Sequence, residues 1–173
     1  MLLPTHGRSG VERVLRGSIA EAVARNLTIP SLILPFTGHR LVDESSGEIT
    51  LTRLLVLGGT TADAQLGVDA AAWFTRELQL TETQVSLLHV QDESPFPEAA
   101  HPELRLRLQY RTGELVDSVV QTCAEQQPQL LVMVSHGHDQ LSDVLLANRT
   151  ERVIHAVQRP LLWIPPTFVP ARS

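Results

Sequence analysis

The stretch that decides the fold runs from Thr5 to Pro35 and reads THGRSGVERVLRGSIAEAVARNLTIPSLILP. A similar stretch returns 130 residues later, from Ser135 to Pro165, and reads SHGHDQLSDVLLANRTERVIHAVQRPLLWIP. The two stretches share a His-Gly pair, a Val-Leu pair, a Glu, a Val and both prolines at matching offsets. Such self-similarity indicates that one structural unit occurs twice in the chain.

The first copy contains a possible anion site. A helix is expected to begin at Ser18 and to run to about Asn26, with Ser18 as its N-cap and Glu21 as the capping-box partner. The N–H groups of that first turn carry the positive end of the helix dipole, and Gly17 has no Cβ to keep an anion away. The segment therefore predicts either a phosphate cradle or a plain helix cap.

The rest of the chain alternates strands and helices according to its hydrophobic periodicity. The predicted strands are Ser31–Leu34, Arg53–Leu57, Val85–Val90, Arg105–Arg111, Leu130–Val134 and Leu161–Ile164, and the predicted helices cover about residues 62–78, 114–126 and 148–158. Near-continuous apolar runs in most of the strands indicate a mostly parallel sheet that is covered on both faces.

The pattern around His-Gly and Gly-Ser resembles the C-terminal part of a universal stress protein domain, whose nucleotide-binding forms carry Gly-x2-Gly-x9-Gly-Ser/Thr. The resemblance continues in Leu54–Thr60 as the first strand and turn, Val85–Val90 as the second strand and Leu130–Gly137 as the fourth. It implies an α/β, doubly wound, mostly parallel five-stranded sheet with helices on both faces, of the adenine nucleotide alpha hydrolase-like type. It also implies a tandem-type protein with an N-terminal strand-helix-strand remnant of a second copy.

This resemblance divides the chain into three parts. Residues 1–38 correspond to the C-terminal half of a first universal stress domain, residues 39–50 to a polar linker, and residues 51–168 to a complete domain. A piece of about forty residues cannot bury enough surface to fold alone, so the half-domain must dock on another surface. We expect Ser31–Leu34 to lie beside Leu161–Ile164, and exchange with another chain is the alternative.

The first copy keeps most of the family motif. Pro4 replaces the first Gly of the motif, whereas Gly7, Gly17 and Ser18 fit it. The resemblance makes Gly7, Gly17, Ser18 and Ile19 the residues that would hold the phosphates of ATP or AMP. The half-domain nevertheless lacks the strands that supply the adenine pocket in the family, so it has only one half of the site.

The second copy has lost the motif. Val134 replaces its first Gly, and Ala147-Asn148 stand where the family has Gly-Ser. The Ala147 methyl group and the following Arg149 crowd the place where a phosphate would approach. Gly58 stands where the family has an adenine-contacting Asp. We therefore expect the complete domain to keep the fold with a degraded nucleotide site and no bound cofactor.

Charge and composition limit the function classes. The net charge of −5, without aromatic residues interleaved in a basic patch, argues against nucleic acid. Residues 1–40 hold five Arg and two Glu, a balance of +3 that suits phosphate but is also typical of a solvated helix face. Every basic residue is Arg, which excludes a Walker A lysine and a lysine Schiff base. The lack of a long apolar run or signal-peptide core, together with a single Cys, predicts a cytoplasmic protein.

Other chemistry is poorly supported. His136, His138 and Asp139 supply only part of a zinc shell without a Cys pair, so no metal site is predicted. Ser135, His136 and Asp139 are the residue types of a catalytic triad, but no Gly-x-Ser-x-Gly elbow accompanies them. Cys123 lies on the apolar stripe of the helix over residues 114–126, which favours a buried packing thiol over a nucleophile.

Two functions from different classes remain. We predict a universal-stress-protein-like, non-catalytic stress-response or interaction module that works through its sheet edge and a dimer surface. The alternative is an ATP- or AMP-binding stress protein that uses the Gly7/Gly17-Ser18 loop. A hydrolase of unknown substrate is a more remote alternative, and weak nucleotide hydrolysis is left open. We expect a homodimer through the terminal strands and the half-domain, with no nucleic acid or membrane partner.

Overall fold

The computed structural model describes residues 2–4, 28–35, 41–49, 51–90, 101, 104–134 and 152–170, with the backbone alone for residues 2–4. The elements in chain order are β1 (Leu2–Pro4), β2 (Ser31–Leu34), β3 (Arg53–Gly58), α2 (Thr61–Glu77), β4 (Gln84–Val90), β5 (Arg105–Arg111), α3 (Leu115–Gln126), β6 (Leu130–Val134) and β7 (Leu161–Ile164). Residues 152–157 are also helical. The predicted elements from residue 53 onward are thus confirmed to within one residue, except that the last helix is described only over 152–157. The helix predicted from Ser18 lies outside the described residues.

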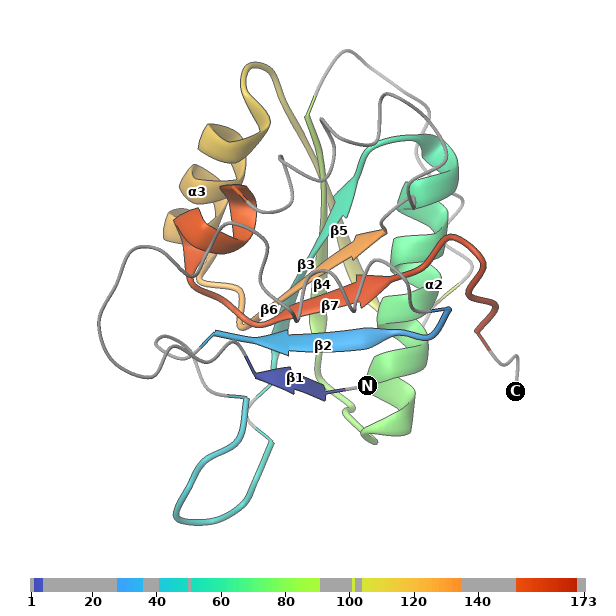
Figure 1. Cartoon of the computed structure of the whole chain (residues 1–173), viewed down its shortest axis with the longest axis vertical. Coiled ribbons are helices and arrows are strands. Elements are labelled where there is room, and N and C mark those ends of the chain that lie inside the picture. The colour runs from blue at the N-terminus through green and yellow to red at the C-terminus, as the bar shows by residue number, and fades with distance from the viewer. Residues whose placement is uncertain are drawn as a thin grey trace.

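The strands form one sheet in the order β1-β2-β7-β6-β3-β4-β5. The five strands from β7 to β5 are all parallel to their neighbours, which confirms the predicted five-stranded doubly wound core. In Figure 1, α2 lies on one side of this core, and α3 with helix 152–157 lies on the other. The strands β1 and β2 of the N-terminal part extend the same sheet to seven strands.

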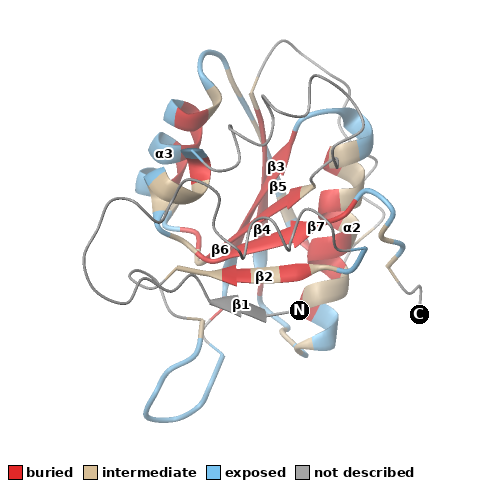
Figure 2. Cartoon of the chain, viewed as in Figure 1, coloured by how far each residue is buried: buried red, intermediate tan, exposed pale blue. Residues whose placement is uncertain are grey.

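The core has two layers because successive side chains of a strand point to opposite faces. In β3, Leu54 and Val56 pack in the layer under α2, whereas Leu55 and Leu57 pack in the layer under α3. Figure 2 shows the buried residues concentrated along the central strands, with exposed residues on the outer sides of the helices. This burial on both faces explains why the central strands are apolar at nearly every position.

Helix α2 lies unusually close to the central strand. A Cβ added at Gly67, in the middle of the helix, would lie 2.6 Å from Cγ1 of Val56. A glycine inside a helix costs about 1 kcal/mol relative to alanine. The close approach of α2 to β3 is the packing reason for this glycine.

The connection between the N-terminal part of the chain and the domain that begins at residue 51 is an exposed turn. Val42 and Ile49 form an isolated antiparallel bridge, and Oδ1 of Asp43 accepts hydrogen bonds from the backbone N–H groups of Ser45 and Ser46, both at 2.9 Å. The Ser45 hydroxyl also donates to Asp43, and these hydrogen bonds lower the Asp43 pKa from 3.8 to about 2. This polar connection is exposed and has its own turn structure.

Both copies of the repeat form the same strand pair. β1 lies parallel to β2 with Leu2 opposite Leu32, and β6 lies parallel to β7 with Val132 opposite Leu162. Partner residues are 30 positions apart in both pairs, and the two pairs are 130 positions apart in the chain. The spacing of the sequence repeat is thus reproduced in the register of the strands.

The two pairs meet at β2 and β7, which run antiparallel with Leu32 opposite Leu162. These two leucines occupy the same position in the repeat, so their pair lies on a pseudo-twofold axis. The flanking partners are Ser31 with Trp163 and Ile33 with Leu161. A rotation about this axis interchanges the two flanking pairs. The pairing confirms that Ser31–Leu34 lies beside Leu161–Ile164, and β7 of the same chain covers the edge of β2.

Candidate functional site

The candidate site lies at the carboxyl ends of the parallel strands, where β3 meets β6. The chain passes from β3 through α2 to β4 on one side and later reaches β6 on the other side. Open α/β sheets bind ligands at such a reversal of strand order. The described residues nearest this point are Gly58 at the end of β3 with the turn into α2, and the half-buried Val134 at the end of β6, which stands where the family motif has its first Gly. The end of β4 lies on the other side of β3.

Gly58 has no room for a side chain. A Cβ built on it would lie 2.8 Å from Cβ of Ala64 and 3.2 Å from Cδ1 of Leu87. The first distance is shorter than real Cβ contacts, and the neighbour is a short side chain on a packed helix that cannot swing away. A carboxylate at this position, which the resemblance predicts for nucleotide-binding members, is sterically incompatible with the observed packing.

The amino end of α2 is closed by its own residues. Thr60 is the N-cap, and its hydroxyl accepts a hydrogen bond from the Asp63 N–H at 3.1 Å. Oδ2 of Asp63 accepts in turn from the Thr60 N–H, also at 3.1 Å. This capping box places a carboxylate at the positive end of the helix dipole, where a phosphate would otherwise be attracted.

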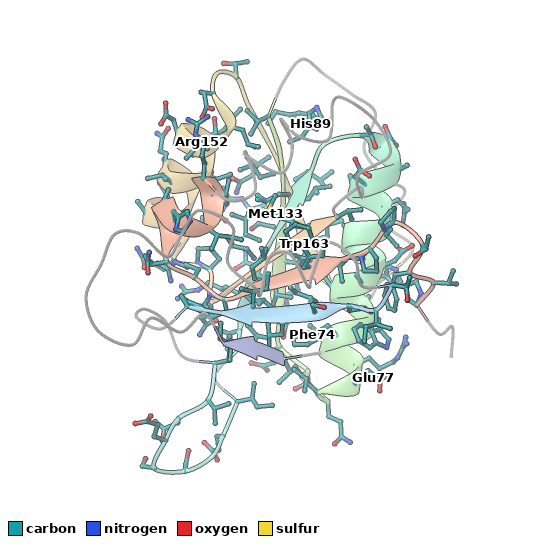
Figure 3. The ribbon with its side chains drawn as sticks, viewed as in Figure 1. Phe74, Glu77, His89, Met133, Arg152 and Trp163 are labelled. Carbon is teal, nitrogen blue, oxygen red and sulfur yellow. The ribbon has the colours of Figure 1, made fainter. Side chains whose placement is uncertain are left out.

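His89, near the end of β4, is a buried polar residue of this edge that sequence reasoning missed. The residue is 5% exposed, and its ring meets the Tyr110 ring edge-on, with 6.2 Å between the ring centroids. Nδ1 lies 2.9 Å from the Gly58 carbonyl oxygen. A carbonyl can only accept, so Nδ1 carries the hydrogen, and Nε2 is buried without a hydrogen-bond partner among the described residues. Figure 3 shows His89 beyond Met133 and Trp163, toward the carboxyl edge. A polar residue within an apolar strand was the signal available in the sequence.

The site residues predicted in the first copy, Gly7, Gly17, Ser18 and Ile19, lie outside the described residues. Ala147 and Asn148 of the second copy also lie outside them. The described strands β1 and β2, which flank the first motif, have the same pairing as the strands that flank the second. The phosphate loop itself therefore stays a prediction.

Two other predictions, a buried Cys123 thiol and the lack of a metal site, can be compared with the structure only where it describes the residues. Cys123 is 5% exposed, and burial raises the pKa of its thiol to about 11, so it is a protonated packing group as predicted. Among the described residues, no three His, Cys, Asp or Glu side chains group together as metal ligands. His136, His138 and Asp139 lie outside this part of the chain. No helix over the described ranges is long and apolar enough to cross a membrane.

Comparison with known proteins gives a family match over part of the chain. The model of the universal stress protein family matches residues 98–165. No curated protein matches the sequence. The matched part includes β5, α3, β6 and β7, and so contains the second copy of the repeat.

Solved structures share the fold at low sequence identity. A universal stress protein from Archaeoglobus fulgidus is 17% identical with a TM-score of 0.67, and the match covers 95% of this chain and 59% of that one. This chain therefore spans little more than half the length of that relative. A hypothetical protein, studied for a structure-based assignment of its biochemical function, is 19% identical with a TM-score of 0.51, over 68% of this chain and 97% of that one.

A universal stress protein family protein from Arabidopsis thaliana was solved with AMP bound. It is 16% identical, covers 66% of this chain and 91% of that one, and has a TM-score of 0.45, too low to support an inference about this chain. The resemblance to the universal stress protein family is confirmed, by the family match over residues 98–165 and by a fold shared along most of the chain.

Proposed function

We propose that this chain is a universal-stress-protein-like, non-catalytic interaction module whose complete domain does not hold an adenine nucleotide. One observation carries the proposal, namely the packing of Gly58 against Ala64, which leaves no room for a side chain at the end of the central strand. The resemblance predicts an adenine-contacting carboxylate at that position. Without it, the domain keeps the fold but lacks a group that selects the base.

The start of α2 supports the same conclusion. Asp63 already occupies the N–H group of Thr60, so a phosphate arriving there would displace a carboxylate and meet its negative charge. In the second copy, Ala147 and Asn148 replace the Gly-Ser of the family motif. Both ends of an adenylate would thus lack a partner in the complete domain.

The edge strand β5 is the surface we propose for protein interaction. Leu108 and Tyr110 are 45% and 47% exposed, and β5 is the last strand of the sheet that the described residues form. An edge strand is a template for pairing with another chain.

A homodimer through the terminal strands remains part of the proposal in a narrower form. In the described structure, β2 of the same chain covers the edge of β7. A dimer built through β7 would therefore require two chains to exchange their N-terminal segments.

The competing function is nucleotide binding by the first copy, with ATP or AMP at Gly7 and Gly17-Ser18.

The first experiment asks whether a nucleotide is bound. Purified protein is denatured, and any released nucleotide is identified by mass spectrometry, while melting is followed with and without Mg-ATP or Mg-AMP. We expect no stoichiometric nucleotide and no shift. A ligand at 100 times its Kd would stabilise the fold by about 2.7 kcal/mol, which a melting curve detects easily.

Two matched variants locate any binding that is found. Gly17→Arg fills the predicted cradle, whereas Gly10→Arg adds the same side chain elsewhere in the loop. Bound ATP that is lost in Gly17→Arg and kept in Gly10→Arg would overturn the proposal and establish the N-terminal motif as the site. Phosphate release from Mg-ATP that the same variant abolishes would overturn the non-catalytic assignment.

A further inference from the structure

Two adjoining hollows lie at the amino ends of β3, β4 and β5, the sheet edge opposite to the candidate site described above. The larger has a volume of about 480 Å³ and is lined by Thr52, Arg53, Glu82, Gln84 and Arg105. The smaller, of about 220 Å³, shares Arg53 and Gln84 and adds Ser86 and Arg107 among its lining residues. The two hollows form one groove, which we call the amino-edge groove.

The sheet register places the polar side chains of this groove in a row. Arg53 is opposite Gln84, and Gln84 is opposite Arg105, so the three side chains point to the same face. Ser86 and Arg107 form the next row on that face, because residues two apart in a strand point the same way. This is the face covered by α3.

The arginines of the groove are not neutralised by the described residues. The guanidinium groups of Arg53, Arg105 and Arg107 make no hydrogen bond or ion pair with any described residue. Arg111, at the far end of β5, is paired with Glu125, the second carboxylate of the groove. The three arginines carry +3, Glu82 carries −1, and Glu125 is balanced by Arg111. The groove therefore has a local charge of +2 in a chain whose net charge is −5.

Ser86 and Gln84 add hydrogen-bonding groups to the groove. Ser86 is 5% exposed and lines the smaller hollow, and its hydroxyl makes no hydrogen bond with the described residues, although it is not among the polar atoms that are closed off from solvent. The exposed Gln84 side chain, in the row before it, also makes no hydrogen bond in the described structure. Both side chains are therefore available to a ligand in the groove.

We propose that the amino-edge groove binds a phosphate-bearing anion with at least two phosphoryl groups. Arginine donates hydrogen bonds in a planar fork that matches phosphate oxygens, and the Ser86 hydroxyl and Gln84 amide can donate as well. Adjacent strands are about 4.8 Å apart, so the backbones of Arg53 and Arg105 are separated by about 10 Å. A diphosphate or triphosphate chain spans such a row, whereas a single carboxylate reaches only one arginine.

Calorimetric titration of the whole chain with pyrophosphate and tripolyphosphate tests this site, at about 50 mM salt to limit screening. We expect saturable 1:1 binding, weaker by about tenfold in Arg53→Gln and in Arg107→Gln and by a few-fold in Ser86→Ala. Arg76→Gln, on α2 at the other face, is the matched control and should bind as the wild type does. Absence of saturable heat, or equal affinity in all variants, would overturn the site.

Two further arms identify the ligand and the location. Amide chemical shifts should move at Gln84, Ser86 and Arg107, and shifts confined to other residues would contradict the proposal. If ATP binds with the same affinity as tripolyphosphate, and Gly17→Arg changes neither affinity, then the groove recognises the phosphate chain alone. A glutamate oligopeptide that binds where pyrophosphate does not would replace the phosphate proposal by an acidic protein partner.

Discussion

The two copies of the repeat form the same strand pair in different surroundings. β6 and β7 lie inside the sheet, and all four residues of β7 are buried. β2 has the same offset from its partner β1, but its residues alternate between buried and half-buried. The comparison separates two effects of one sequence pattern, because pairing register is set within the repeat, whereas burial depends on what packs around it.

The largest effect should come from the leucines on the pseudo-twofold axis. Leu162 is 2% exposed and packs in the core under α2, whereas Leu32 is only half-buried at the rim of the same core. We expect Leu162→Ala to lower the free energy of unfolding by about 3 kcal/mol and Leu32→Ala by about 1 kcal/mol. Urea unfolding measures both variants, and equal losses would show that the two copies share the same packing.

The glycines at the end of β3 should give the next largest effect. An alanine at position 58 would collide with Ala64, whereas the nearest atom to a Cβ at Gly59 is Oδ2 of Asp63 at 3.3 Å. We expect Gly58→Ala to destabilise the fold by about 2 kcal/mol. Gly59→Ala should change stability by about 0.5 kcal/mol or less. Thermal melts that rank the two variants in the opposite order would remove the steric basis of the degraded site.

The smallest effect concerns the turn at residues 43–46, which follows the first copy and has no counterpart described after the second. The Asp43 pKa is lowered to about 2, so this carboxylate stabilises the turn above pH 3.8 and loses that contribution as pH falls through 2. Titration by NMR should therefore show Asp43 ionised at pH 3, and Ser45→Ala should move its pKa toward 3.8. An ordinary titration of the wild type near pH 4 would mean that the hydrogen-bonded turn does not persist in solution.

Much of the fold could be predicted because it depends on local sequence patterns. The apolar runs of β3, β4 and β6 and the repeat spacing are sufficient to place the strands and the β2–β7 pair. The contact of Gly58 with Ala64 depends on the distance between α2 and β3, which no local pattern contains. The row from Arg53 to Arg105 depends equally on strand register. The predicted phosphate loop stays a sequence prediction, because Gly7, Gly17, Ser18 and Ile19 lie outside the described residues.

Disulfide trapping across the axis tests the duplication most directly. With Cys123 replaced by Ala, cysteines at positions 32 and 162 would sit opposite each other in antiparallel strands, at a separation of about 5 Å that suits a disulfide. Cysteines at positions 32 and 88, on β2 and β4, form the control pair. We predict an intramolecular cross-link in a chain of monomer size for the first pair and none for the control. A covalent dimer, or no cross-link in a chain that is folded by circular dichroism, would contradict the docking of the first copy on its own second copy.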